Sequence, residues 1–240
     1  MKVAVFSTKP YDRTFLDAAN VDHHHEIHYF TPHMNEETVS LAAGFEAVCI
    51  FVNDDLTDAD AVATLAANGT KLIALRAAGF NNVNLAAAAA HGLTVVRVPA
   101  YSPYAVAEHT LALLLALNRR NPRAYNRTRD GNFSLDGLLG FDIHGRTVGV
   151  IGTGKIGIEV IRLFTGFGCT ILAHDPYPSD KATELGVTYV DLPTLFAQAD
   201  IVTLHCPLTP QTYHIIAATA VSQMKRGATL INTSRGGIEN

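Results

Sequence analysis

The sequence has 240 residues, of which 48% are hydrophobic and 17% are charged, and its formal net charge at pH 7 is -4. This length accommodates two domains or one large domain with a proper core, and the composition is typical of folded globular proteins rather than disordered chains. The acidic balance argues against a nucleic-acid-binding protein, which would carry clustered lysine and arginine.

Three further features bear on cellular location. The most apolar stretch, residues 111–117, is far too short to cross a membrane, and the N-terminal apolar run is too short for the hydrophobic region of a signal peptide. Cys49, Cys169 and Cys206 are widely spaced in apolar runs, which is typical of free thiols in a reducing compartment. These features predict a cytoplasmic protein.

The first hundred residues alternate short runs of β-forming residues with helical patterns. Alternation of this kind predicts parallel strands covered by helices, and we expect a first α/β domain over residues 1–102. The expected strands are 2–7, 25–30, 47–52, 71–76 and 94–98, and the expected helices are 12–20, 36–43, 58–68 and 84–91.

Ser102-Pro103 breaks this alternation, and apolar residues at helical spacing then predict one long inter-domain helix over 104–129. The glycine-containing segment that follows predicts a loop, and the arm over 121–145 would suit a subunit interface in a homo-oligomer. A second α/β domain is expected over 103–240. Beyond residue 175 its expected helices are 181–185 and 193–198, and its expected strands are 188–190, 201–205 and 229–233.

A glycine turn organises this second domain. The sequence Gly152-Thr153-Gly154-Lys155-Ile156-Gly157 lies between a strand-like run and a helical pattern, which is the context of the dinucleotide-binding fingerprint. In that fingerprint Gly152 makes the tight turn, Gly154 lets the backbone approach a pyrophosphate, and Gly157 allows close packing of the helix on the strand. The helix N-terminus at Lys155 and Ile156 then faces the phosphates.

The residue Asp175 points to the identity of the dinucleotide. It ends the second strand of this unit, roughly 20 residues past the turn, where an acid accepts hydrogen bonds from an adenosine ribose. The same carboxylate repels a 2′-phosphate, and Pro176-Tyr177-Pro178 supplies no arginine to hold one. NAD is therefore favoured over NADP.

Histidines do not indicate a metal site. His23, His24 and His25 are adjacent, so on an extended segment they point to alternate faces, and no cluster of cysteine or acid with ligand spacing accompanies them. His109 and His205 lie at positions where histidine is more often structural than catalytic. No metal is expected.

The sequence resembles the NAD-dependent D-2-hydroxyacid dehydrogenases along essentially its whole length, most closely the fermentative, lactate-forming members of bacteria. Several stretches in the right order carry this resemblance and are more specific than the glycine turn alone. They are Cys49–Asp55, Ala74–Arg76, Ala78–Val83, Val95–Tyr101, Ala105–His109, the glycine turn, His205–Thr209 and Asn232–Gly236.

The resemblance implies a fold and a reaction. It implies an α/β protein with a flavodoxin-like substrate domain and a Rossmann NAD-binding domain, the latter a doubly wound parallel sheet that is incomplete at residue 240. The implied reaction is the reversible reduction of pyruvate by NADH to D-lactate.

The resemblance also implies a set of substrate-binding residues. Arg235 would be the catalytic arginine, because a guanidinium is always charged and offers a planar fork of donors to a carboxylate. The backbone of Ala78 and Gly79 would cradle the substrate carboxylate, and Tyr101 would close over the substrate. Phe51 would tune substrate size and favour pyruvate over branched 2-keto acids, although a phenylalanine ending a strand can equally fill the core.

The implied cofactor-binding residues lie at the ends of the strands of the second domain. Thr212 stands where relatives often have asparagine, and its hydroxyl can still donate one bond. Asn84 stands where many relatives have aspartate. The implied set is Gly152, Gly154, Lys155, Ile156, Gly157, Asp175, Cys206, Pro207, Thr212, Thr233, Ser234 and Arg235.

Hydride transfer to a ketone also needs a proton donor, best a histidine paired with a carboxylate. In the family this pair lies C-terminal to the arginine, in segments absent from the 240 residues, so we expect a fragment of a longer enzyme. The alternatives are a dehydrogenase for another D-2-hydroxyacid, an NAD-sensing regulator similar to dehydrogenase-related corepressors, and an inactive truncated product. The loops at Phe51 and Tyr101 count against the regulator.

Overall fold

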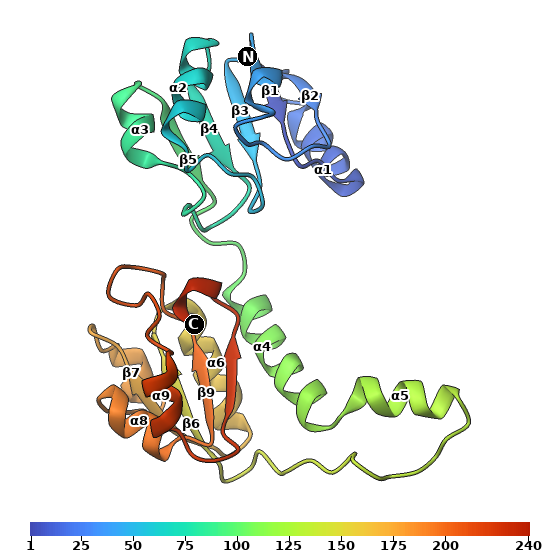
Figure 1. Ribbon diagram of the computed structural model, residues 1–240, viewed down its shortest axis with the longest axis vertical. Helices are drawn as coiled ribbons and strands as arrows, with labels where there is room; N and C mark the ends of the chain where they lie inside the picture. Colours follow the sequence, from blue (N-terminus) through green and yellow to red (C-terminus); the bar gives the residue numbers. More distant parts are fainter. The chain divides into compact units, whose positions relative to one another are not determined.

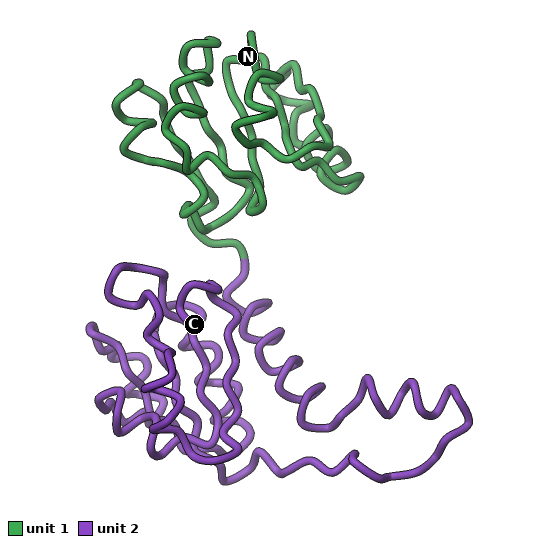
Figure 2. Tube along the Cα trace, viewed as in Figure 1, with its two compact units in different colours: residues 1–101 green, residues 102–240 purple.

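The computed structural model describes residues 1–240 and divides into two compact units, residues 1–101 and residues 102–240 (Figure 2). Each unit is built on one five-stranded sheet in which every pair of neighbouring strands is parallel. The predicted α/β class is therefore confirmed (Figure 1). No helix has the length and apolar content needed to cross a membrane.

The first unit has the strand order β2-β1-β3-β4-β5, which is the order of flavodoxin-like folds and confirms that prediction. Its strands are β1 (Lys2–Val5), β2 (Glu26–Tyr29), β3 (Ala47–Ile50), β4 (Leu72–Leu75) and β5 (Thr94–Arg97). Its helices are α1 (Pro10–Asn20), the 3-10 helix η1 (Val39–Ala42), α2 (Ala59–Ala67) and α3 (Leu85–Ala90).

Local sequence explains where two of these helices start and stop. The Asp58 carboxylate accepts from the first backbone N–H groups of α2, and the Asn84 side chain does the same for α3. Gly69 and Gly92 follow the two helices with positive φ angles of 95° and 70°, which glycine adopts without strain.

The helix expected over 36–43 is wrong in its extent. Only the short 3-10 helix η1 forms there. The Asn35 side chain accepts hydrogen bonds from the N–H groups of Glu37 and Thr38, and this local turn competes with an α-helical start.

The second unit has the strand order β10-β9-β6-β7-β8. Counted from β6, this is the doubly wound Rossmann order, with its switch point between β6 and β9. Its strands are β6 (Thr147–Ile151), β7 (Thr170–His174), β8 (Thr188–Tyr189), β9 (Ile201–Leu204) and β10 (Thr229–Asn232). Its helices are α4 (Pro103–Asn118), α5 (Asn121–Arg129), α6 (Lys155–Gly166), α7 (Asp180–Glu184), α8 (Leu192–Gln198), α9 (Ala218–Gln223) and the 3-10 helix η2 (Gly236–Ile238).

Helices cover both faces of the second sheet. All four residues of β9 are buried, as expected for a parallel strand covered on two sides. Ile201 belongs to the core cluster that includes residues of α4 and α6, whereas Val202 and Leu204 belong to the cluster that includes residues of α8 and α9. Side chains that alternate along the strand thus supply two separate cores.

The single helix predicted over 104–129 is wrong. Arg120 adopts a left-handed conformation with φ of 54° and separates α4 from α5. Pro122 lacks the N–H that would continue the helical ladder, and it lies instead in the first turn of a new helix, where that N–H is dispensable. Helix α9 was not predicted from the sequence; it has six residues, of which only Ala220 is buried.

Candidate functional site

At two positions of the turn after β6, the fold itself requires glycine. Gly152 has φ of 98°, and a Cβ there would lie 2.7 Å from the backbone of His205 and Cys206. A Cβ on Gly157 would overlap the carbonyl oxygen of Gly152, because α6 begins so close to the turn. These two glycines hold β6, β9 and α6 together, as the fingerprint predicts.

Gly154 is different, because no atom of the chain requires a glycine there. A Cβ at this position would meet nothing within 4 Å. Gly154 is also the N-cap residue of α6, and no side chain caps the first N–H groups of that helix. Open space in front of an uncapped helix N-terminus fits a pyrophosphate that approaches the backbone from outside. The turn therefore fits a bound dinucleotide.

Asp175 is held by the same turn. Its Oδ2 accepts from the N–H of Thr153 at 2.7 Å and from the Thr153 hydroxyl at 3.1 Å, and its Oδ1 accepts from the N–H of Tyr177 at 2.9 Å. The Tyr189 hydroxyl donates to Thr153 Oγ1 at 2.9 Å and so orients that side chain. A carboxylate has further lone pairs, so this anchoring leaves it able to accept from a ribose.

The ends of β9 and β10 are joined by hydroxyl groups. Ser234 Oγ donates to the carbonyl oxygen of Cys206 at 2.6 Å, and Thr233 Oγ1 lies 3.0 Å from Thr110 Oγ1 of α4. The Thr212 hydroxyl donates to the carbonyl oxygen of Pro207 at 2.6 Å. The Thr212 hydroxyl proton is thus already used in a hydrogen bond within the loop. A role of Thr212 in cofactor binding stays a prediction.

Arg235 follows β10 at the carboxyl end of the second sheet. Its side chain is exposed, forms no ion pair, and donates only one hydrogen bond, from Nη1 to the carbonyl oxygen of Ser234 at 2.8 Å. Its backbone carbonyl accepts from Asn232 Nδ2 at 2.9 Å, which fixes the main chain at this point. The remaining N–H donors of the guanidinium are free to meet a carboxylate.

In the first unit, the predicted substrate residues follow β3 and β4. Phe51 is half-buried, and the Arg76 guanidinium lies 5.4 Å from the centre of its ring. The Ala78 carbonyl accepts from Arg97 Nη1 at 2.8 Å, while the N–H groups of Ala78 and Gly79 have no acceptor within the chain. Tyr101 is 68% exposed. The two free N–H groups are suited to an anion such as a carboxylate.

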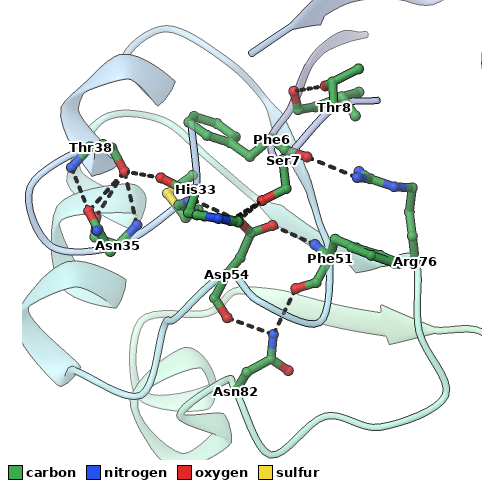
Figure 3. Close-up of polar contacts among 12 residues, drawn as sticks. Phe6, Ser7, Thr8, His33, Asn35, Thr38, Phe51, Asp54, Arg76 and Asn82 are labelled. Carbon is green, nitrogen blue, oxygen red and sulfur yellow. Dashed lines mark hydrogen bonds and ion pairs between the residues drawn. The ribbon is translucent and has the colours of Figure 1, made fainter. Parts of the chain in front are cut away.

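Arg76 has a structural role in the first unit. Its guanidinium donates to the carbonyl oxygens of Phe6 and Cys49, and its Nε lies 3.4 Å from Asp12 Oδ1. These contacts join the carboxyl ends of β1 and β3 (Figure 3).

Sequence reasoning missed one polar cluster at the carboxyl edge of the first sheet, formed by Ser7, His33, Asp54 and Asn82 (Figure 3). The only signal in the sequence is that Ser7 and Asp54 each follow a strand-like run. The predicted sites thus form two sets, one at the ends of β6, β7, β9 and β10 and one at the ends of β3 and β4. No group of three or more His, Cys, Asp or Glu residues is placed to hold a metal ion.

His205 gives a prediction about stability and pH. Desolvation lowers the pKa of this ring from 6.5 to about 4. At pH values between 4 and 6.5, His205 is protonated in the unfolded chain but neutral in the folded protein. The free energy of unfolding should therefore fall as the pH is lowered from 6.5 to 4, by up to about 3 kcal/mol. Urea unfolding at pH 7, 5 and 4 should show this fall, and His205→Gln should reduce it. An equal pH dependence in both proteins would contradict the prediction.

A doubly wound sheet with a G-x-G-x-x-G turn at its switch point and an acid after the next strand defines a dinucleotide-binding protein of the Rossmann type. Residues 111–240 match the sequence profile described as "D-isomer specific 2-hydroxyacid dehydrogenase, NAD binding domain". The chain belongs to the D-isomer specific 2-hydroxyacid dehydrogenases, which are NAD-dependent oxidoreductases acting on small 2-hydroxy acids.

Individual relatives agree with this assignment. The chain is 56% identical to D-lactate dehydrogenase of Escherichia coli (strain K12), over 99% of its own length and 72% of that protein. It is 53% identical to a 2-hydroxyacid dehydrogenase homolog of Haemophilus influenzae, with the same coverage.

Solved structures agree as well. The apo-structure of D-lactate dehydrogenase from Escherichia coli matches with a TM-score of 0.92 at 55% identity, covering 100% of this chain and 76% of that one. D-lactate dehydrogenase from Aquifex aeolicus, complexed with NAD and lactic acid, matches with a TM-score of 0.87 at 33% identity, covering 99% of this chain and 70% of that one.

Proposed function

We propose that this NAD-dependent oxidoreductase is a D-lactate dehydrogenase, which reduces pyruvate with NADH to D-lactate and catalyses the reverse reaction. The observation that carries this proposal is the unpaired guanidinium of Arg235, held by its backbone at the carboxyl end of β10. The 56% identity with a D-lactate dehydrogenase, across nearly the whole chain, supports pyruvate as the substrate.

Each residue has a distinct part in this reaction. When bound, NADH would supply the hydride that reduces the keto carbon. The Arg235 fork binds the substrate carboxylate and polarises the keto oxygen, where negative charge develops. The N–H groups of Ala78 and Gly79 are suited to donate hydrogen bonds to a carboxylate, and Asp175 accepts a hydrogen bond from the ribose.

The keto oxygen must also gain a proton. His205 is unsuited to donate it, because desolvation lowers its pKa to about 4 and leaves the ring neutral at pH 7. The glutamate and histidine that the family resemblance places C-terminal to Arg235 remain the proposed donor pair.

The test is NADH oxidation by pyruvate, measured with the intact protein. We expect turnover, with the D enantiomer of lactate as product in a chiral assay. A protein that binds NADH but fails to oxidise it with any 2-keto acid would contradict an enzymatic role. Turnover with other 2-keto acids but not pyruvate would instead indicate a different D-2-hydroxyacid.

Cofactor choice gives a prediction at Asp175. Replacing it by serine removes the charge that repels a 2′-phosphate and two anchoring bonds to the turn. We expect the KM for NADH to rise about tenfold, the effect of losing about 1.4 kcal/mol, and the preference for NADH over NADPH to shrink. Steady-state kinetics with both cofactors would check this, and an unchanged ratio of kcat/KM values would contradict it.

We also propose that the protein forms homo-oligomers through the arm of the second unit, α5 and residues 130–145. Phe133, Leu135 and Leu139 in this arm are 77%, 79% and 89% exposed, so the arm presents apolar side chains that a second copy would cover. Sedimentation should show a dimer or larger assembly, and the triple replacement of these residues by serine should dissociate it. An unchanged mass in the triple variant would contradict the proposal.

We place the protein in the cytoplasm, which its three free cysteines support.

A further inference from the structure

The Asp54 side chain is fully buried at the carboxyl edge of the first sheet, where it joins three segments of the chain (Figure 3). Its Oδ1 accepts from the Ser7 hydroxyl at 2.5 Å and from the N–H of Met34 at 2.7 Å. Its Oδ2 accepts from the N–H of Phe51 at 2.5 Å. A buried carboxylate is tolerated only when such donors surround it, so its position is closely defined.

Ser7 links this carboxylate to His33. A serine hydroxyl has one proton, and because Ser7 donates it to Asp54, the 2.7 Å contact with His33 Nδ1 requires the histidine to donate. Ser7 is also buried and has a positive φ of 53°, which is rare outside glycine. Such backbone strain persists only where the surroundings hold it, and it gathers at functional sites.

The same cluster holds Phe51 on both sides of its backbone. Asp54 binds the Phe51 N–H, while Asn82 Nδ2 donates to the Phe51 carbonyl at 3.1 Å and to the Asp54 carbonyl at 2.9 Å. The N–H of Asp54 donates to the Phe51 carbonyl at 3.1 Å and closes the turn. The backbone from which the Phe51 ring projects is therefore fixed by hydrogen bonds to its N–H and carbonyl groups.

We propose that Asp54, together with Ser7 and Asn82, is a positioning residue that sets the place of the Phe51 ring and thereby the size of the 2-keto acid side chain accepted. This inference rests on the proposed function, in which Ala78 and Gly79 meet the substrate carboxylate, because Phe51 follows β3 just as those residues follow the neighbouring strand β4. One methylene group in an apolar pocket changes selectivity by about tenfold or more, so a small displacement of the ring is measurable. Arg235 belongs to another element and is unaffected.

The test compares pyruvate with 2-oxobutanoate in the intact protein, using Phe51→Ala, Asn82→Ala, Ser7→Ala and Asp54→Asn. Phe51→Ala should shift the ratio of kcat/KM values about tenfold towards 2-oxobutanoate. Asn82→Ala and Ser7→Ala should shift it in the same direction by about threefold, mainly through the KM for pyruvate. Asp54→Asn should have a larger effect, and the two milder variants serve if it fails to fold.

A double variant separates positioning from general stability. If Asn82 acts through Phe51, then Phe51→Ala combined with Asn82→Ala should show no more shift than Phe51→Ala alone. Asn84→Ala is the matched control, because it also loses two side-chain hydrogen bonds in this unit but has no contact with the turn. It should lower the thermal midpoint and leave the substrate ratio unchanged.

The possible results separate this inference from the proposed function. If Asn82→Ala lowers stability as Asn84→Ala does, with no change in the substrate ratio, the positioning role is overturned. If Phe51→Ala leaves the ratio unchanged while pyruvate is still reduced, Phe51 does not face the substrate and the inference fails alone. If the unmodified intact protein reduces neither acid, the proposed function fails and takes the inference with it.

Discussion

Replacing Arg235 by glutamine is expected to lower kcat/KM for pyruvate by about 10³-fold. The guanidinium is charged at all relevant pH values and forms no ion pair in the protein, so its donors are available to substrate. Loss of two charge-assisted hydrogen bonds at about 2 kcal/mol each corresponds to roughly three powers of ten in rate. Lysine should restore only part of the activity, because a point charge lacks the planar fork.

The fold should survive this change, since the exposed Arg235 side chain makes a single hydrogen bond, to the carbonyl oxygen of Ser234. NADH binding, followed by fluorescence titration, should therefore change by less than about threefold, a free energy below 1 kcal/mol. Arg226→Gln is a suitable control, because this exposed arginine precedes β10 at the opposite end of the strand. A loss of less than tenfold in Arg235→Gln would remove Arg235 from the catalytic role.

Replacing Gly157 by alanine is expected to destabilise the second unit by more than about 3 kcal/mol and to abolish NADH binding. Within a helix this replacement would ordinarily stabilise by about 1 kcal/mol. Here the sign reverses, because the new Cβ overlaps the carbonyl oxygen of Gly152, a backbone atom that cannot move without opening the turn. Urea unfolding monitored by circular dichroism would measure the loss.

Replacing Gly154 by alanine tests the ligand-binding role of the turn separately from its role in stability. Its Cβ meets no atom of the chain, so the free energy of unfolding should change by no more than about 1 kcal/mol. The methyl group nevertheless occupies the space that a pyrophosphate approaches, so the Kd for NADH should rise more than tenfold. Equal stability losses in both variants, or normal NADH affinity in Gly154→Ala, would contradict the assignment of these two glycines.

Local pattern was sufficient to predict the α/β class. Alternating strand and helix signals indicate parallel sheets, because each signal depends on residues close together in the chain. The glycine turn marked the first strand of the second sheet, and the helices before Gly69 and Gly92 end as predicted. The family resemblance implied the two fold types, whose strand orders spacing alone does not give.

The two charged residues of the candidate site in the second unit both lie at strand ends. Asp175 was identified because it ends a strand of a sheet that binds ligands at its carboxyl edge, whereas the role of Arg235 at the end of another strand was implied by the family resemblance. Their bonding partners were not predictable in this way. Asp175 is anchored to Thr153, and Arg235 is left unpaired, only because the folded strands bring particular neighbours together.

The helix predicted over 104–129 overlooked a local signal, because apolar spacing ends at Leu117 and Pro122 lies where the segment divides into α4 and α5. Tertiary contacts decided what no local signal carries. The cluster around Asp54 joins it to Ser7, 47 positions earlier, and to Asn82, 28 positions later. Such contacts depend on the order of strands in the sheet. The sequence by itself determined which elements form and what chemistry their ends carry, whereas only the tertiary structure decided which of those ends meet, because hydrogen bonds between distant residues have no local signature.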